Sequence, residues 1–94
     1  MKDLTPNKRK LIFDEEGLKM LASRIKQLRS EKKITQEELA YRSELTLSQI
    51  ARIETVKINP TVSTMFRISK ALDISMSELF DFKTLKIIPK STEK

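Results

Sequence analysis

The 94-residue sequence contains no cysteine, no histidine and no tryptophan, and it has a single glycine. Without cysteine and histidine, the chain lacks disulfides, zinc sites built on these ligands, thiol nucleophiles and histidine-based catalytic triads. The single glycine, Gly17, is too few for glycine-rich nucleotide loops, which need several. These absences argue against most classes of enzyme, and we expect neither a metal site nor a cofactor.

Long apolar runs are also missing. No segment approaches the roughly 20 apolar residues of a membrane span, and residues 1–10 contain no apolar stretch of the length that a signal peptide needs. We therefore expect a cytoplasmic, nucleoid-associated protein with no membrane partner.

Charge of one sign is concentrated at the two ends of the chain. In total, 19 Lys and Arg against 13 Asp and Glu give a net charge of +6. Residues 1–10 carry +3 and residues 83–94 carry another +3, so the residues between them are balanced. A basic chain suits nucleic acid, but it also suits ribosomal, membrane-surface or merely soluble proteins. Net charge alone does not identify the partner.

Apolar residues recur at helical spacing along most of the chain, with capping residues before them. Asp14, followed by two glutamates, predicts the start of a first helix. Residues 35–38, 46–49 and 75–78 each follow the capping-box pattern S/T-x-x-E/Q, in which the hydroxyl and the fourth side chain each satisfy a backbone N–H. Asn59-Pro60 predicts a further helix start. The predicted helices cover residues 15–31, 36–43, 47–55, 62–72 and 76–80.

The expected fold class is therefore all-α, a compact five-helix domain with a possible short strand or extension after residue 84. We expect the helix over 62–72 to bury one face, formed by Val62, Met65, Phe66, Ile68, Ser69 and Leu72. The glutamate pairs at 15–16 and 37–38 lie where first-turn acids are expected, and adjacent helical residues point apart, so they do not predict a catalytic site.

The second and third predicted helices are separated by very few residues, as in a helix-turn-helix. A small residue, Ala40, allows the next helix to cross closely, and Ile50 and Ile53 are spaced to face inward. Ser48, Gln49 and Arg52 are then expected on the exposed side of the third helix. Arginine can donate two hydrogen bonds to guanine, and glutamine can pair with adenine.

These features resemble the Xre, or lambda repressor/Cro-like, family of helix-turn-helix domains over about residues 25–80. The resemblance implies a lambda-repressor-like fold whose third helix enters the DNA major groove. The residues that it implies for base reading are Leu47, Ser48, Gln49 and Arg52. It is carried by Arg29, Thr35-Gln36-Glu37-Glu38-Leu39-Ala40, Ser48-Gln49-Ile50, Arg52-Ile53-Glu54, Asn59-Pro60 and Ala71-Leu72-Asp73-Ile74-Ser75.

Phosphate contacts are expected from helix starts and from the loop after the third helix, because helix N-termini attract anions. The candidate residues are Gln36, Lys57, Asn59, Arg42 and Tyr41. The resemblance further implies that Arg29 and Glu54 form a structural ion pair, so we do not count them as DNA contacts.

The sequence departs from the family pattern at two turns, where Glu44 and Val56 stand in place of the usual glycines. Glycine tolerates a positive φ, whereas a β-branched residue in that conformation is an outlier. We therefore expect residues 55–59 to follow another path, which affects the placement of Lys57 and Asn59.

We expect a basic arm over residues 1–13, a DNA-binding domain over 14–82 and a basic tail over 83–94. Lys8-Arg9-Lys10 either wraps DNA or belongs to a solubilising tail. The apolar residues near the C-terminus either cover the core or form a dimer surface; they are Phe82, Leu85, Ile87 and Ile88.

The expected function is that of a sequence-specific transcriptional regulator of bacterial or phage type, binding double-stranded DNA as a homodimer. Two domains about 34–36 Å apart would read a pseudo-palindrome. The alternative is an antitoxin-type module that binds a toxin and autoregulates its operon. A controller of a restriction–modification system is a further possibility, as a subtype of the regulator.

Overall fold

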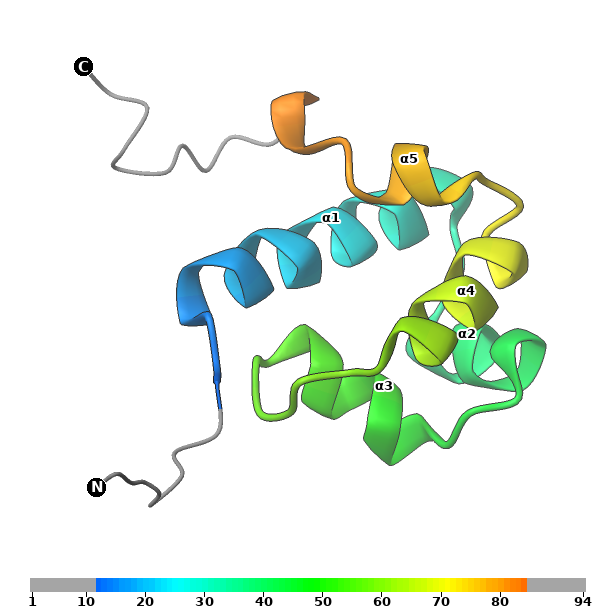
Figure 1. Ribbon diagram of the computed structural model, residues 1–94. Helices are drawn as coiled ribbons and strands as arrows, with labels where there is room; N and C mark the ends of the chain where they lie inside the picture. Colours follow the sequence, from blue (N-terminus) through cyan, green and yellow to red (C-terminus); the bar gives the residue numbers. More distant parts are fainter. Residues whose placement is uncertain (1–11, 85–94) are drawn as a thin grey trace, which may run out of the picture.

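A computed structural model of the chain describes residues 12–84, and within them the fold is all-helical (Figure 1). This confirms the predicted all-α class, and every helix boundary lies within one residue of its prediction. The elements in chain order are α1 (Glu15–Lys32), α2 (Gln36–Ser43), α3 (Leu47–Glu54), α4 (Val62–Ala71), α5 (Met76–Leu79) and the short 3-10 helix η1 (Phe82–Thr84). The predicted strand after residue 84, with Leu85, Ile87 and Ile88, lies outside the described residues, as does Lys8-Arg9-Lys10.

Every α-helix begins at a residue whose side chain caps a free backbone N–H. The caps are Asp14, Thr35, Thr46, Thr61 and Ser75. The capping boxes predicted at 46–49 and 75–78 are complete, with both reciprocal hydrogen bonds. At 35–38 only one of the two predicted hydrogen bonds forms. Thr35 caps the N–H of Glu38, but the Glu38 carboxylate accepts a hydrogen bond from Arg42 at 2.8 Å instead of one from the Thr35 N–H.

The core draws a fully buried aliphatic side chain from each α-helix. These residues are Ile25, Leu39, Ile50, Ile68 and Leu79, with exposed fractions of 0 to 1%. Burying a side chain of this size stabilises the fold by about 1.5–3 kcal/mol, so all five helices depend on one shared core.

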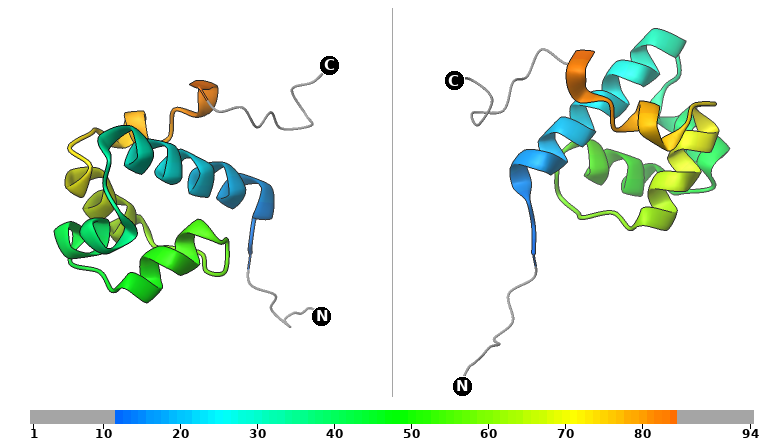
Figure 2. Two further views of the ribbon diagram at one scale, coloured as in Figure 1. Left: turned by 180° about the vertical axis from the view of Figure 1, so that it is seen from behind. Right: turned by 45° about the horizontal axis from the view of Figure 1, so that its top comes forward.

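The arrangement leaves α3 at one edge of the molecule. Figures 1 and 2 both place α5 and η1 beside α1, on the side away from α3. Phe82 of η1 is half-buried against the core, and its ring centroid lies 5.9 Å from that of Phe80. This contact favours core cover over a dimer surface for Phe82.

The buried face of α4 is narrower than the sequence predicts. Met65, Ile68 and Ser69 are buried, but Val62 is 66% exposed and Phe66 is 48% exposed. A helix turns by about 100° per residue, so Phe66 lies roughly a quarter-turn or more away from the centre of the buried stripe. Val62 is the first residue of the helix, where no preceding turn covers it.

A buried arginine that sequence reasoning missed attaches α5 to α1. Arg24 is 8% exposed, and its Nε and Nη2 atoms donate to the backbone carbonyl of Glu78 at 3.0 and 2.7 Å. Glu78 lies near the C-terminal end of α5, whose last carbonyls have no partner within the helix. Its spacing from Leu21 and Leu28 places Arg24 on the apolar face of α1, but this local signal does not indicate its partner on α5.

Each of the first four helices is followed, within one or two residues, by a residue with positive φ, and none of these residues is glycine. They are Lys33, Glu44, Val56 and Asp73, with φ of 58°, 60°, 61° and 59°. In each case two backbone N–H groups return to carbonyls of the last turn, the pattern of a Schellman motif. At the end of α3, for example, Lys57 donates to Arg52 at 2.8 Å and Val56 donates to Ile53 at 3.2 Å.

The prediction that residues 55–59 avoid this conformation is therefore wrong. Val56 adopts it because the turn satisfies two carbonyls at the end of α3 and returns Ile58, which is half-buried, to the core. These gains outweigh a left-handed penalty of about 1–2 kcal/mol. Lys57 and Asn59 consequently lie in a compact loop directly after α3.

We predict that Val56→Gly raises the free energy of unfolding by about 1 kcal/mol, because glycine adopts this φ without a steric penalty. For a domain of this size that corresponds to a melting temperature higher by about 4–8 °C, measurable by circular dichroism. The matched control is Val62→Gly, the same substitution at an exposed helical position, which should lower the melting temperature. Equal effects at the two positions would contradict the prediction.

Candidate nucleic-acid interface

A tight turn holds α3 against α2. Ala40 is 5% exposed, and Leu45 donates its N–H to the Ala40 carbonyl at 3.0 Å, which closes the end of α2. Thr46 then caps α3, and Ile50 and Ile53 are buried at 1% and 3% exposure. The predicted roles of Ala40, Ile50 and Ile53 in the helix-turn-helix are confirmed.

The opposite side of α3 is open to solvent. Leu47 is 43% exposed, and Ser48, Gln49 and Arg52 are exposed. The structure therefore leaves all four residues predicted for base reading exposed on the solvent side of α3, and within the described residues Arg52 has no ion-pair partner. The only carboxylate of α3, that of Glu54, is buried at 3% exposure. This face offers hydrogen-bond donors and one cation without an exposed carboxylate of its own helix.

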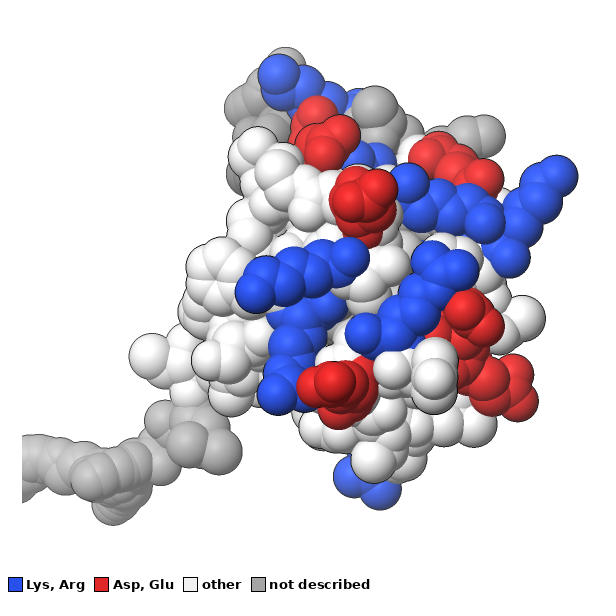
Figure 3. Space-filling model, turned by 90° about the vertical axis from the view of Figure 1, so that its right-hand side faces the viewer, with Lys and Arg blue, Asp and Glu red and all other residues white. Residues whose placement is uncertain are grey.

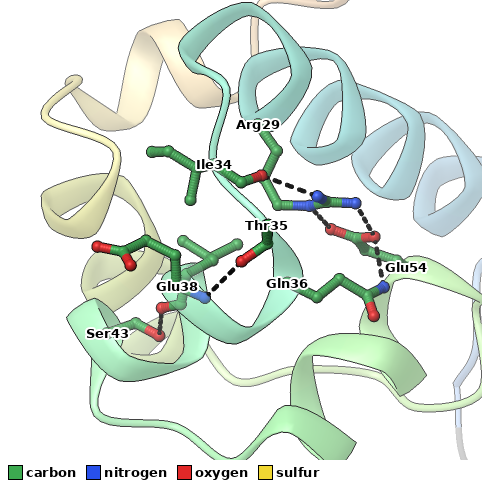
Figure 4. A network of polar contacts seen from close by, with 8 residues as sticks. Arg29, Ile34, Thr35, Gln36, Glu38, Ser43 and Glu54 are labelled. Carbon is green, nitrogen blue, oxygen red and sulfur yellow. Dashed lines mark hydrogen bonds and ion pairs between the residues drawn. The ribbon is translucent and has the colours of Figure 1, made fainter.

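Glu54 anchors the end of α3 to the two preceding helices (Figure 4). Arg29 of α1 donates from Nε at 2.7 Å and from Nη2 at 2.9 Å to its two carboxylate oxygens. Gln36, the first residue of α2, donates from Nε2 to Glu54 at 2.9 Å. The side chains of Arg29 and Glu54 are 18% and 2% exposed. The charge is thus removed from water and compensated by a bidentate pair and one neutral donor.

The third donor of Arg29 reaches the backbone. Its Nη1 atom donates to the carbonyl of Ile34 at 2.9 Å, in the connection between α1 and α2. The hydrogen bond with Glu54 raises the pKa of Arg29, burial opposes this, and the Coulomb attraction of Glu54 adds to it. A raised pKa of a cation contributes stability that is fully present below the unfolded-state value and is lost only as the pH rises through the folded value. The stabilising effect of the cation therefore persists throughout the neutral range.

The predicted phosphate-contact residues are not equivalent in the structure. Lys57 is exposed immediately after α3, and Tyr41 is 81% exposed. Arg42 is paired with Glu38, and the side chain of Asn59 donates to the Ile12 carbonyl at 3.3 Å. Both have a partner within the protein.

The Gln36 side chain also has one amide N–H committed, to Glu54. Thr35 caps the backbone N–H of Glu38. The other backbone N–H groups in the first turn of α2 have no partner within the helix, so they are better anion donors than the Gln36 side chain.

Arg67 of α4 is a second residue that sequence reasoning missed. Its Nη1 atom lies 3.4 and 3.3 Å from the carbonyls of Ser43 and Glu44 and 3.3 Å from the Glu44 carboxylate. It therefore supports the end of α2 just before the turn to α3. Arg42, Ser43, Glu44, Arg67 and Lys70 line a shallow hollow of about 290 Å³ here.

The side of the molecule that lies to the right in Figure 1 has mixed charge. Figure 3 shows Lys and Arg side chains lying among Asp and Glu on this side. Opposite charges that alternate in this way largely cancel over a Debye length of about 8–10 Å. This side is therefore not a uniformly basic surface.

Comparison with known proteins identifies the family. Residues 25–79 match the family model HTH_3, described as helix-turn-helix. The chain belongs to this helix-turn-helix family. The resemblance that the sequence motifs carry is confirmed, and the match extends from the middle of α1 to the end of α5.

Two curated relatives of this helix-turn-helix protein are 38% identical to it. One is the immunity repressor protein of Bacillus phage phi105, matched over 65 residues that cover 69% of this chain and 45% of the repressor. The chain therefore spans less than half the length of that relative. The other is an uncharacterised HTH-type transcriptional regulator of Sinorhizobium fredii, matched over 61 residues, 65% of this chain and 79% of the regulator.

Solved structures of restriction-modification controller proteins have a similar fold. C.AhdI from Aeromonas hydrophila superposes with a TM-score of 0.66 at 31% identity, over 68% of this chain and 97% of that one. C.Esp1396I, solved as a tetramer with its natural 35 base-pair operator, gives a TM-score of 0.65 at 38% identity, over 68% and 84% of the two chains. Of the helices in residues 12–84, none is long and apolar enough to cross a membrane.

We predict that Arg29→Met lowers the free energy of unfolding by about 3 kcal/mol, because it leaves the Glu54 carboxylate buried without a cation. Urea unfolding followed by circular dichroism measures the change. The matched control, Arg42→Met, removes an exposed pair with Glu38 and should change stability by at most about 0.5 kcal/mol.

The double variant Arg29→Met/Glu54→Leu should recover most of the loss, since it removes the stranded charge as well. A loss that is the same for Arg29→Met and Arg42→Met would show that burial of the pair has no energetic consequence.

Proposed function

We propose that the chain is a sequence-specific DNA-binding transcriptional regulator that places α3 in the major groove and binds its operator as a homodimer. The observation that carries the proposal is the exposed face of α3, where four side chains able to contact bases lie together while the carboxylate of the same helix is buried. The rigid attachment of both ends of α3, through the Thr46 cap and through Glu54, supports it further.

The named relatives support the same function. A phage immunity repressor and an HTH-type transcriptional regulator are similar in sequence, and a controller protein of similar fold is solved on its operator as a tetramer. A single α3 covers only a few base pairs, so two copies on half-sites about 34–36 Å apart give the longer pseudo-palindrome that specificity requires. The tail over residues 83–94, with Leu85, Ile87 and Ile88, is the proposed dimer contact.

Arg52 is the principal base-reading residue in this proposal. Its side chain is exposed on α3 and has no ion-pair partner within residues 12–84, so its guanidinium can donate two hydrogen bonds to O6 and N7 of guanine. Leu47, at the first turn of the helix, offers an apolar surface for a thymine methyl group, and Ser48 can donate or accept.

Lys57, Tyr41 and the start of α2 are the proposed phosphate contacts, which position the protein without reading sequence. A regulator that acts on bacterial or phage DNA works in the cytoplasm at the nucleoid. No enzymatic activity is part of the proposal.

The basic arm over residues 1–13 is proposed to add further phosphate contacts. Asn59, in the loop after α3, donates to the Ile12 carbonyl and so ties the start of the described chain to that loop (Figure 1). Lys8-Arg9-Lys10 precedes Ile12 by at most four residues, or about 14 Å of extended chain. The cations are therefore within reach of DNA that lies against α3.

We predict that Arg52→Ala removes the preference for guanine at one position of each half-site, with a loss of about 1–3 kcal/mol on the preferred sequence. Selection of bound sequences from random DNA, followed by titration of the enriched site, measures both effects. Lys57→Ala is the control, and it should weaken binding to all sequences about equally and lower the salt slope by about one. If the wild-type chain enriches no sequence at moderate salt, the proposed function is wrong.

We predict that replacing Lys8, Arg9 and Lys10 together by alanine weakens binding to all sequences and reduces the slope of log K against log salt by up to about three, without changing the enriched sequence. Fluorescence anisotropy at several salt concentrations measures the slope. A variant with the wild-type slope would identify this segment as a solubilising tail instead of a DNA-binding arm.

A further inference from the structure

The orientation of the Gln49 side chain is fixed by the cap of α3. Its backbone N–H donates to Oγ1 of Thr46 at 3.0 Å, and the backbone N–H of Thr46 donates to Oε1 of Gln49 at 2.9 Å. A backbone N–H can only donate, so the side-chain atom that it meets must be the amide oxygen. The Nε2 group therefore remains for a ligand, with two N–H donors and no acceptor.

We propose that Gln49 reads DNA through its Nε2 donors, because Oε1 is already held by Thr46, and that it selects bases whose major-groove edge presents acceptors. This inference rests on the proposed function, since it concerns the same face of α3. Guanine presents N7 and O6, and thymine presents O4, whereas cytosine presents only its N4 amino donor. Adenine has the N7 acceptor but places its N6 amino donor beside it. The expected order is guanine and thymine above adenine, with cytosine last.

This order replaces the adenine pairing that residue type alone predicts. A bidentate contact with adenine needs the amide oxygen and the amide nitrogen of glutamine at once. The oxygen has a second lone pair, but its bond to Thr46 fixes where it lies, so an adenine contact must either share the oxygen with that backbone N–H or displace it. A displaced backbone N–H would face the DNA interface without a partner, which is unfavourable. The capping box therefore disfavours the adenine contact, whereas it leaves the Nε2 donors available.

The variant Gln49→Glu separates the two functions of the side chain. Glutamate is as suitable as glutamine at the fourth position of a capping box, so the cap is retained. Its second carboxylate oxygen replaces Nε2 and can only accept hydrogen bonds, which favours the amino groups of cytosine and adenine. Gln49→Ala is the matched control, because it removes the side-chain half of the capping box and the base contact, while the backbone N–H of residue 49 still donates to Thr46.

The test is selection of bound sequences from random DNA by the full-length wild type, Gln49→Glu and Gln49→Ala. We expect one position in each half-site to prefer guanine or thymine with the wild type by about fivefold or more, the lower end for one good contact. That position should change to cytosine or adenine with Gln49→Glu and lose its preference with Gln49→Ala. The added negative charge weakens binding to all sequences, so preferences are compared within each profile.

Thermal unfolding of the free proteins checks the cap independently. Gln49→Ala should lower the melting temperature by about 4 °C or more, and Gln49→Glu should leave it near the wild-type value. Equal melting temperatures for wild type and Gln49→Ala would show that the Gln49 side chain does not hold the Thr46 N–H and would overturn the inference.

Three outcomes of the selection separate the inference from the proposed function. If the wild type enriches no sequence, the proposed function fails and the inference fails with it. If the wild type enriches a site whose Gln49-dependent position is adenine, only the inference is overturned. It is also overturned if Gln49→Glu leaves the wild-type profile unchanged at every position.

Discussion

The buried carboxylate of Glu54 is the interaction on which the geometry of α3 depends. A charge with 2% exposure is tolerated only where donors surround it, and here they come from Arg29 on α1 and Gln36 on α2. Three helices thus meet at one pair of oxygen atoms. None of them can turn about its own axis without leaving the charge uncompensated. Because Glu54 is the last residue of α3, this constraint also sets the angle at which the exposed face of α3 is presented.

The two glutamines at this interface show how the fold assigns different chemistry to one residue type. The carboxylate of Glu54 requires the amide nitrogen of Gln36, whereas the backbone N–H of Thr46 requires the amide oxygen of Gln49. An isolated glutamine can present either end to a ligand. In this molecule the partners inside the protein decide which end remains, so the hydrogen bonds that stabilise the scaffold also define the binding surface.

Helix existence and the inward face of α3 could be predicted from the sequence because caps and 3.6-residue spacing are local signals. The errors arise where tertiary contacts decide. Val56 has a positive φ because the chain must return Ile58 to the core, and no local preference of valine indicates this. The Glu38 carboxylate pairs with Arg42 instead of the backbone N–H of Thr35. The burial of Arg24 depends on α5, more than 50 residues away in the chain. The partner of Gln36 is equally invisible without the packing of the helices, whereas the partner of Gln49 follows from the local capping-box pattern.

The absence of glycine from four left-handed helix ends has a consequence for the lifetime of the protein. A penalty of about 1–2 kcal/mol at Val56 alone enlarges the unfolded fraction by roughly five- to thirtyfold over that of a chain relieved of it. Proteases act on unfolded chains, so changes of this size alter steady-state abundance several-fold. These four residues lie outside the exposed face of α3 that is proposed to meet DNA. The rate at which the protein is degraded can therefore be adjusted there without replacing any of the side chains proposed to read bases.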